Sequence, residues 1–432
     1  MRSRIAGRRL LTAAGIYVSA VLGFLGQILA ARWLGVEEYG VLAIILAVTT
    51  FAQLVTDLTV EEAVIKYGFR YVQEERWGKL RRLYARAFRV KLIGAALAGV
   101  VIAALSPASG ALFNHPEMLV PLLFAALLPL AQAPEGIAST ALLLRSRYDI
   151  RSLFLVVGMG TRFVALVIGA RMGDVAVVLA LIVVAQALTT AAIGAVALAS
   201  FRRYPRVPHE PLGTDRPEIV RFMRDSAVGS TMTTFQGAVA PIVLGMVANP
   251  VQVGLYRVAL APQNALAAVS SPIRLILLTE QTRDWERGDI QTVLRGVRRF
   301  TIGATLLMGV ITPPLIVFMP EIVRAVYSDK YAAAGDAARF VLLSSVLLTV
   351  IGWSKSLPVS IGRPRLRIWT HGIQALVLLP LTALFGLWWQ ATGAAAALAV
   401  SSVVFAAMWG VIVVRLHREH RSTPSTTLPE AP

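Results

Sequence analysis

Residues 31–41 read ARWLGVEEYGV and separate two apolar runs, 10–31 and 40–60. Each run has about the 20 residues that a helix needs to cross the hydrocarbon core of a bilayer. A turn between two membrane helices accounts for the polar side chains, because a cation and an indole suit the C-terminal end of one helix and carboxylates suit the N-terminal end of the next. The stretch therefore predicts a helical hairpin, in which Gly35 and Gly40 flank the turn.

The composition extends this prediction to the whole chain. Of its 432 residues, 56% are hydrophobic and 15% are charged, and the mean hydropathy is +0.67. A soluble domain carries about 25% charged residues. The chain is therefore expected to be a membrane protein.

Apolar segments recur along the entire sequence. We expect an all-α polytopic membrane protein with about twelve transmembrane helices, near 10–31, 40–60, 92–113, 118–142, 153–171, 175–199, 226–248, 251–278, 300–319, 337–358, 369–389 and 391–414. Prolines near 129–134 and 262–272 are expected to interrupt some of them.

The two halves of the chain resemble each other weakly. Gly40 in VEEYGVLA precedes Gly254 in VQVGLYRVA by 214 positions, and other matching stretches keep a similar offset. Parallel repeats of six helices are a transporter pattern. We expect two pseudo-equivalent six-helix bundles around a central cavity, with an N-terminal bundle at 1–200, a cytoplasmic linker at 201–225, a C-terminal bundle at 226–416 and a disordered cytoplasmic tail at 417–432.

The net charge of +18 indicates orientation rather than nucleic-acid binding in a chain of this kind. Most of the 42 Lys and Arg fall in alternate connections, which places both termini in the cytoplasm. The first helix is too long for a secretory signal and is expected to be retained. Basic and apolar side chains alternate at helical spacing over 74–91, which predicts a helix on the inner membrane surface.

The sequence lacks the residues that several kinds of catalytic or cofactor-binding site require. The chain has no Cys, its five His show no zinc-protease spacing, and no Gly-rich loop precedes a Lys to hold nucleotide phosphates. We expect no enzyme activity, no cofactor and no metal site.

Basic residues inside apolar runs are candidates for binding an anionic substrate, since a charge at that depth costs about 3 kcal/mol on insertion scales. Arg162 lies midway along its run, and the alternative is a structural pair with Glu135 or Asp57. Arg257 and Lys355 are the next deepest, and the alternative for each is a side chain that reaches the headgroups. Arg32 is the fourth candidate.

Acidic and amide residues form a second set of candidates. Glu135 follows two prolines and, with Asp57, is a candidate for carrying a coupling ion, H⁺ or Na⁺. The alternative is that Glu135 pairs with a buried Arg, and that Asp57 balances Lys66 or Arg70. Amides inside apolar runs bind sugar hydroxyls or hold helices together. The candidates of this type are Gln236, Gln263 and Asn264.

Four stretches of the sequence, the opening one among them, resemble segments of the polysaccharide-biosynthesis flippases. AARWLGVEEYGVLAIILAV is similar to the first hairpin of that family, and LVTDLTVEEAVIKY, VGLYRVALAP and VYSDKYAAAGDAARFVLL resemble later segments. Val36 departs from the usual proline. The resemblance implies membership in the multidrug/oligosaccharidyl-lipid/polysaccharide exporter superfamily, and alternating access that carries a lipid-linked oligosaccharide from the cytoplasmic to the outer leaflet.

The implied location is the inner or plasma membrane, and the implied partners are membrane lipids, a glycan polymerase and glycosyltransferases. Two other functions stay open. A multidrug cation exporter of the same superfamily would need deep carboxylates and aromatic residues rather than arginines. A membrane enzyme of glycan assembly would need a large outside loop or an acidic metal-binding motif, and neither is evident in the sequence.

Overall fold

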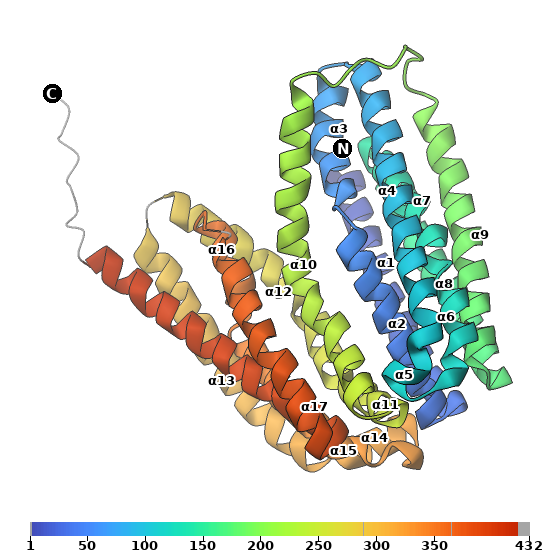
Figure 1. Cartoon of the computed structure of the whole chain (residues 1–432). Coiled ribbons are helices and arrows are strands. Elements are labelled where there is room, and N and C mark those ends of the chain that lie inside the picture. The colour runs from blue at the N-terminus through green and yellow to red at the C-terminus, as the bar shows by residue number, and fades with distance from the viewer. Residues whose placement is uncertain (1, 288, 364, 422–432) are drawn as a thin grey trace. The chain divides into compact units, whose positions relative to one another are not determined.

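The computed structural model describes residues 2–287, 289–363 and 365–421, and in these ranges every regular element is helical. The all-α expectation is confirmed (Figure 1). The tail beyond 421 and the side chains of the four N-terminal arginines lie outside the described part. The longer helices are α1 (Arg2–Leu34), α2 (Val36–Thr56), α3 (Val60–Gln73), α4 (Trp77–Leu105), α7 (Leu128–Leu144), α8 (Tyr148–Met172), α9 (Val175–Phe201), α10 (Asp215–Val247), α11 (Pro250–Ala259), α12 (Ala261–Glu286), α13 (Ile290–Val317), α14 (Met319–Tyr327), α15 (Ala334–Val350) and α17 (Arg365–Arg421).

The predicted hairpin is present at the start of the chain. Helix α1 ends at Leu34 and α2 begins at Val36, and Gly35 between them has φ = 82°, which favours glycine. Glu37 and Glu38 occupy the first turn of α2. The sequence pattern thus located both helix ends.

Eight helical segments of the described chain are long and apolar enough to span a membrane. They match expected segments, and the last of them, α17, contains the final two, whose helical halves meet at the non-helical residue Gln390. The three other expected segments fall in α10, in α11 with α12, and in α15 with a short turn after it. The chain is therefore a multi-pass membrane protein.

Prolines interrupt the helices where the sequence indicated. Pro129 opens α7 after the short helix α6 (Leu119–Ala125), and Pro262 opens α12 after α11. Proline is tolerated in a first helical turn, because its missing N–H would have no partner there. Each interruption leaves two helices in place of one straight span.

The chain divides into two compact units. Unit 1 comprises the described residues up to Val258 together with Val323–Ala332, and unit 2 comprises the others. The expected bundles at 1–200 and 226–416, with a linker at 201–225, stay a prediction. The connection between α9 and α10 packs firmly within unit 1, since Tyr204 stacks on Trp77 with 5.1 Å between ring centroids.

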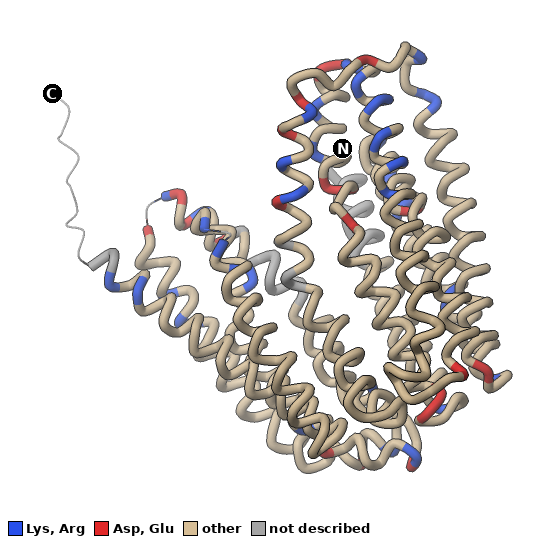
Figure 2. Tube along the Cα trace, in the orientation of Figure 1, with Lys and Arg blue, Asp and Glu red and all other residues tan. Residues whose placement is uncertain are grey.

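The basic residues of unit 1 gather at the end where α9 finishes and α4 and α10 begin (Figure 2). The core beneath them includes Leu80, Leu83 and Tyr84, all buried. The expectation of a surface helix at 74–91 is therefore wrong: residues 77–91 are the first turns of α4, which continues into its apolar span. The apolar face of this stretch meets α3 and α7 instead of lipid, because neighbouring helices cover it.

An ion pair fastens the start of α10 to α3 and α4. Lys79 Nζ lies 2.8 Å from Asp215 Oδ2, and the Tyr71 hydroxyl donates to the same oxygen at 2.9 Å. The side chains of Lys79 and Asp215 are 17% and 18% exposed. Donation by Lys79 lowers the pKa of Asp215 below its ordinary value. The pair is sheltered enough to contribute to stability.

Replacing Asp215 with asparagine is expected to lower the free energy of unfolding by about 2 kcal/mol, because the hydrogen bonds lose their charged acceptor. A lowered carboxyl pKa stabilises the fold above the unfolded value of about 3.9, and that contribution is lost as pH falls through the folded value. Thermal unfolding in detergent at neutral and acidic pH measures both effects. Asp225→Asn is the control, since Asp225 is 63% exposed and pairs only with its neighbour Arg224. Equal losses in the two variants would contradict the assignment.

Helices α2 and α11 cross within unit 1 at two glycines. A Cβ on Gly40 would overlap the carbonyl oxygen of Pro250, and a Cβ on Gly254 would overlap that of Val36. Gly40 and Gly254 are the residues that the repeat offset of 214 aligns, and the same offset aligns Val36 with Pro250. Each glycine thus meets the carbonyl that corresponds to its own repeat partner's contact, which is the pattern of contacts across a two-fold axis. Glycine is needed here because backbone meets backbone.

Unit 2 has its own core. Trp353 and Trp409 pack edge to face with 5.7 Å between ring centroids, and the Trp353 indole donates to the Thr301 hydroxyl at 2.9 Å. These residues bring together α13, α17 and the 3₁₀ turn Gly352–Lys355 that follows α15. The turn interrupts the expected segment 337–358.

Candidate functional site

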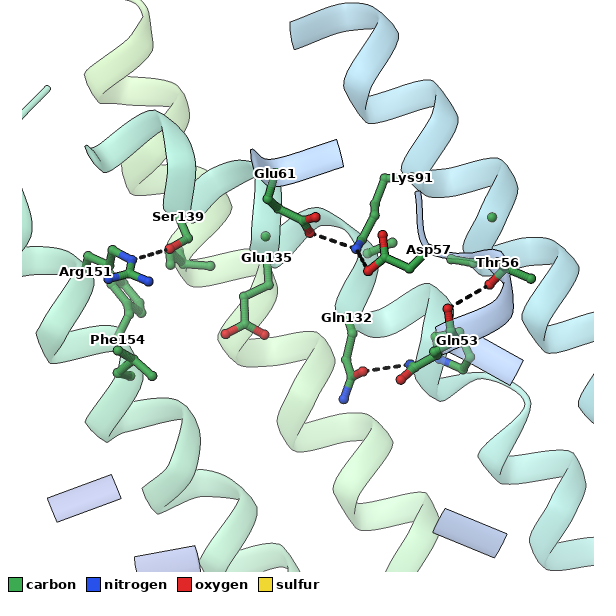
Figure 3. A pocket seen from close by; sticks show the side chains of 17 residues that line it. Gln53, Thr56, Asp57, Glu61, Lys91, Gln132, Glu135, Ser139, Arg151 and Phe154 are labelled. Atoms are coloured by element: carbon green, nitrogen blue, oxygen red, sulfur yellow. Dashed lines mark hydrogen bonds and ion pairs between the residues drawn. The ribbon is translucent and has the colours of Figure 1, made fainter. Parts of the chain in front are cut away.

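A polar cavity of about 380 Å³ lies inside unit 1, among α2, α4, α7 and α8 (Figure 3). Apolar bundles rarely enclose polar groups without a function, because each charged side chain at such depth is costly. The polar residues that line it are Gln53, Thr56, Asp57, Glu61, Lys91, Gln132, Glu135, Ser139 and Arg151. The cavity therefore holds charges of both signs.

Lys91 lies between two carboxylates. Its Nζ is 2.9 Å from Asp57 Oδ2 and 2.7 Å from Glu61 Oε1, and its side chain is 19% exposed. The chain places both acids there by ending α2 at Thr56 and starting α3 at Val60, so that Asp57 is extended and accepts a hydrogen bond from the Thr59 N–H at 3.0 Å. The cluster carries one more negative than positive charge.

Glu135 projects into the same cavity from α7 (Figure 3). Gln186 donates to Glu135 Oε2 at 2.6 Å, and Arg162 on α8 interacts electrostatically with this carboxylate. Arg162 is half-buried. The two charges therefore act on each other, but among the described residues no ion pair within 4.0 Å joins Arg162 to Glu135, so the structural pair stays a prediction.

Two further hydrogen bonds complete the lining, one between two amides and one from the Arg151 guanidinium. Gln53 donates to the Gln132 side chain at 2.8 Å, and Arg151 donates to the Ser139 hydroxyl at 2.8 Å. Carboxylates beside amides and hydroxyls are oxygen ligands for a hard cation or acceptors for a proton. In this lining the three carboxylates stand beside two cations, Lys91 and Arg151.

A second cavity, of about 210 Å³, lies inside unit 2 and includes two of the predicted residues. Lys355, in the 3₁₀ turn after α15, and Gln263, in α12, both line it, together with the hydroxyls of Ser270, Ser345 and Thr349. This cavity offers one cation and several neutral donors. It suits an anionic or hydroxylated group.

Arg32 and Arg257 lie elsewhere in unit 1. The Arg32 guanidinium donates to the carbonyl oxygens of Val326 at 2.7 Å and Ala325 at 2.6 Å, so it caps the C-terminal end of α14. The Arg257 guanidinium interacts electrostatically with the Tyr39 hydroxyl. Both residues therefore have protein partners beside the glycine crossing of α2 and α11.

The remaining predicted amides are placed separately. Gln236 is half-buried in α10, and Asn264 is exposed near the start of α12. Of the nine candidates, Asp57 and Glu135 share the unit 1 cavity, and Gln263 and Lys355 share the unit 2 cavity. Arg162 interacts electrostatically with Glu135 but is not among the cavity's lining residues. The structure places Arg32, Arg257, Gln236 and Asn264 outside both cavities.

Sequence reasoning missed Lys91 and Glu61. It proposed Lys66 or Arg70 as the partner of Asp57, whereas Asp57 pairs with Lys91, and both Lys91 and Glu61 line the cavity. A signal was available, because Lys91 is the last charge before the uncharged run 92–105 of α4 and is therefore the deepest of its basic series. A second signal is the spacing of Asp57 and Glu61, which are four positions apart and could therefore share one cation.

Comparison with known proteins assigns the sequence to a family. The profile of a family described as "Polysaccharide biosynthesis protein" matches residues 28–336. No curated protein matches the sequence.

Solved structures with the same fold are membrane transporters. An inward-facing multidrug resistance transporter of the MATE family and the MOP superfamily superposes with a TM-score of 0.72 at 14% identity, over 92% of this chain and 96% of its own. The lipid II flippase MurJ, in an inward closed conformation, gives 0.67 at 14% identity over 94% and 87%. The Vibrio cholerae MATE transporter VcmN, in a bent form, gives 0.56 at 15% identity over 96% and 98%. The expected exporter fold is confirmed.

Proposed function

This chain belongs to the polysaccharide biosynthesis protein family, and from that membership we propose that it is a flippase for a polyprenyl-pyrophosphate-linked oligosaccharide. The substrate would move from the cytoplasmic to the outer leaflet by alternating access between the two six-helix halves. The observation that carries this proposal is the family match over most of a chain whose fold is that of MATE transporters and of a lipid II flippase.

The chemistry of such a substrate suits the residues present. A polyprenyl tail stays in lipid, whereas a pyrophosphate needs cations and a sugar chain needs hydrogen-bonding groups. Arg162, Arg257, Lys355 and Arg32 are the proposed cations, and Gln236, Gln263 and Asn264 are the proposed sugar ligands. Lys355 and Gln263 are the pair best supported, because they line one cavity.

The unit 1 cavity is proposed as the coupling site. Asp57 and Glu135 line it with Glu61, and uptake of H⁺ or Na⁺ there would change the charge around Lys91 and Arg162. We place both termini in the cytoplasm, and the protein in the inner or plasma membrane beside a glycan polymerase and glycosyltransferases. The basic end of unit 1 supports this orientation, because cytoplasmic loops carry the excess of Lys and Arg.

Deleting the gene is expected to trap lipid-linked oligosaccharide in the inner leaflet and to abolish surface glycan. The distribution of the lipid between leaflets, probed with a membrane-impermeant lectin or oxidant, measures this. Unpolymerised units already present on the outer face would contradict flipping.

Export of cationic dyes is the second candidate function, and the three carboxylates of the unit 1 cavity favour it. Liposomes that extrude dyes but leave the lipid pyrophosphate in place would select that function.

Arg162→Gln is expected to reduce flipping at least tenfold if the guanidinium binds the pyrophosphate, since a charge-assisted hydrogen bond contributes about 1.5–3 kcal/mol. The double variant Arg162→Gln/Glu135→Gln also removes the carboxylate proposed for coupling, so restored flipping is its decisive result. Restored flipping in the double variant means that Arg162 serves only to neutralise Glu135, and it would contradict substrate binding. Arg171→Gln is the control, because Arg171 is exposed and packs on Trp33.

A further inference from the structure

An apolar groove with a basic rim lies within unit 1 and is lined by residues of α3, α4 and α10 and of the loops that precede α3 and α10. Its volume is about 550 Å³, and Val60, Val64, Leu83, Ile219 and Met223 form its floor. Its rim holds four arginines, Arg86 and Arg89 from α4 and Arg216 and Arg224 from α10, and no Asp or Glu is among its lining residues. We call this feature the arginine groove.

The rim arginines are largely without protein counter-charges. Among the residues that the structure describes, Arg86, Arg89 and Arg216 make no side-chain hydrogen bond or ion pair. Arg224 binds only the adjacent Asp225, at 3.1 Å, and is 72% exposed. Two other basic residues at this end of the unit are paired, Lys79 with Asp215 and Arg70 with Glu218. The groove is therefore a local surplus of positive charge.

The groove lies where a lipid phosphate would lie. Helix α4 carries no charge after Lys91, from Leu92 to Leu105, and α10 carries none from Ser226 to Val247. Both helices thus change from basic to uncharged just beyond the rim. In a membrane protein, this change marks the boundary between headgroups and hydrocarbon, where basic pockets on the cytoplasmic side bind anionic lipid.

We propose that the arginine groove binds one anionic glycerophospholipid of the surrounding membrane. Its phosphate lies among Arg86, Arg89 and Arg216, and part of an acyl chain lies along the apolar floor. A soluble anion would satisfy the rim but leave the floor exposed, whereas a lipid matches both, and the volume is within the range of about 300–1,000 Å³ that is typical of small-molecule sites. The bound lipid joins α4 to α10 beside the Lys79–Asp215 pair. The site is independent of the transported substrate.

Native mass spectrometry of the purified full chain, released from nanodiscs that contain phosphatidylglycerol and phosphatidylcholine, tests the proposal. Arg86→Gln/Arg216→Gln is expected to lower the retained phosphatidylglycerol about tenfold or more, since each basic residue near an anionic surface contributes about 1 kcal/mol. The control Arg202→Gln/Arg203→Gln removes the same charge from exposed positions outside the groove, and it is expected to retain wild-type amounts.

Two results would overturn the proposal. Equal retention by the two double variants, with unchanged thermal unfolding in lipid-free detergent, shows that the groove selects no anionic lipid. Retention of added polyprenyl phosphate in place of phosphatidylglycerol, lost in Arg86→Gln/Arg216→Gln, shows that the groove serves the lipid carrier instead. The expected selective loss of phosphatidylglycerol, together with a thermal midpoint that rises with this lipid only when the rim is intact, supports the assignment.

Discussion

Gly40→Leu is expected to prevent α2 and α11 from packing and to lower the free energy of unfolding by more than about 3 kcal/mol. A side chain at position 40 would occupy the place of the Pro250 carbonyl oxygen, and its Cβ would lie only 3.0 Å from the backbone N of Gly254. Backbone atoms cannot rotate away as a side chain can. Relief therefore requires the two helices to separate, which also removes the contacts of Tyr39 and Arg257.

Expression level and the thermal midpoint in detergent measure this loss. Gly194→Leu is the matched control, because a Cβ at Gly194 in α9 meets no atom within 4 Å. Gly254→Leu is expected to be as damaging as Gly40→Leu, since the contact is reciprocal. A stable Gly40→Leu protein would show that the helices do not cross here.

Lys91→Met is expected to have the second largest effect, a loss of about 2–3 kcal/mol, because it leaves two carboxylates, both partly accessible to water, without their cation. Asp57 and Glu61 are 37% and 26% exposed, and both depend on the Lys91 ammonium. Lys66→Met is the control, since Lys66 is exposed and contacts only aromatic rings.

The triple variant Lys91→Met/Asp57→Asn/Glu61→Gln separates stability from transport. It is expected to regain most of the thermal stability, because no uncompensated charge remains. If the cavity couples ion uptake to transport, flipping in liposomes stays impaired. Full flipping by the triple variant would contradict a coupling function for Asp57 and would leave the cluster a structural one.

Most of the fold was predictable because it depends on local patterns. Uncharged runs of about 20 residues located the membrane segments, and the short polar stretch at 31–41 located both ends of the first hairpin. The basic end of unit 1 followed from counting Lys and Arg. The surface helix expected at 74–91 failed, because the pattern shows an apolar face but cannot tell lipid from neighbouring helices as its cover.

The candidate site was predictable only in part. Depth in an apolar run singled out Arg162 and Glu135, and the structure places Glu135 in the unit 1 cavity, where it interacts electrostatically with Arg162. It did not single out Lys91, whose partners Asp57 and Glu61 come from a break between α2 and α3 that no hydrophobic period reveals. Pairing depends on where helices distant in the sequence meet, and so does the capping of α14 by Arg32.

The sequence by itself determined the membrane class, the order of the helices and the family, because the bilayer requires long uncharged segments and motifs are read along the chain. Only the tertiary structure decided which charges face one another. Gly40 and Gly254 show the difference: the repeat aligned them in sequence, but their direct contact appeared only once α2 and α11 had packed, since a missing Cβ has meaning only against the backbone that takes its place.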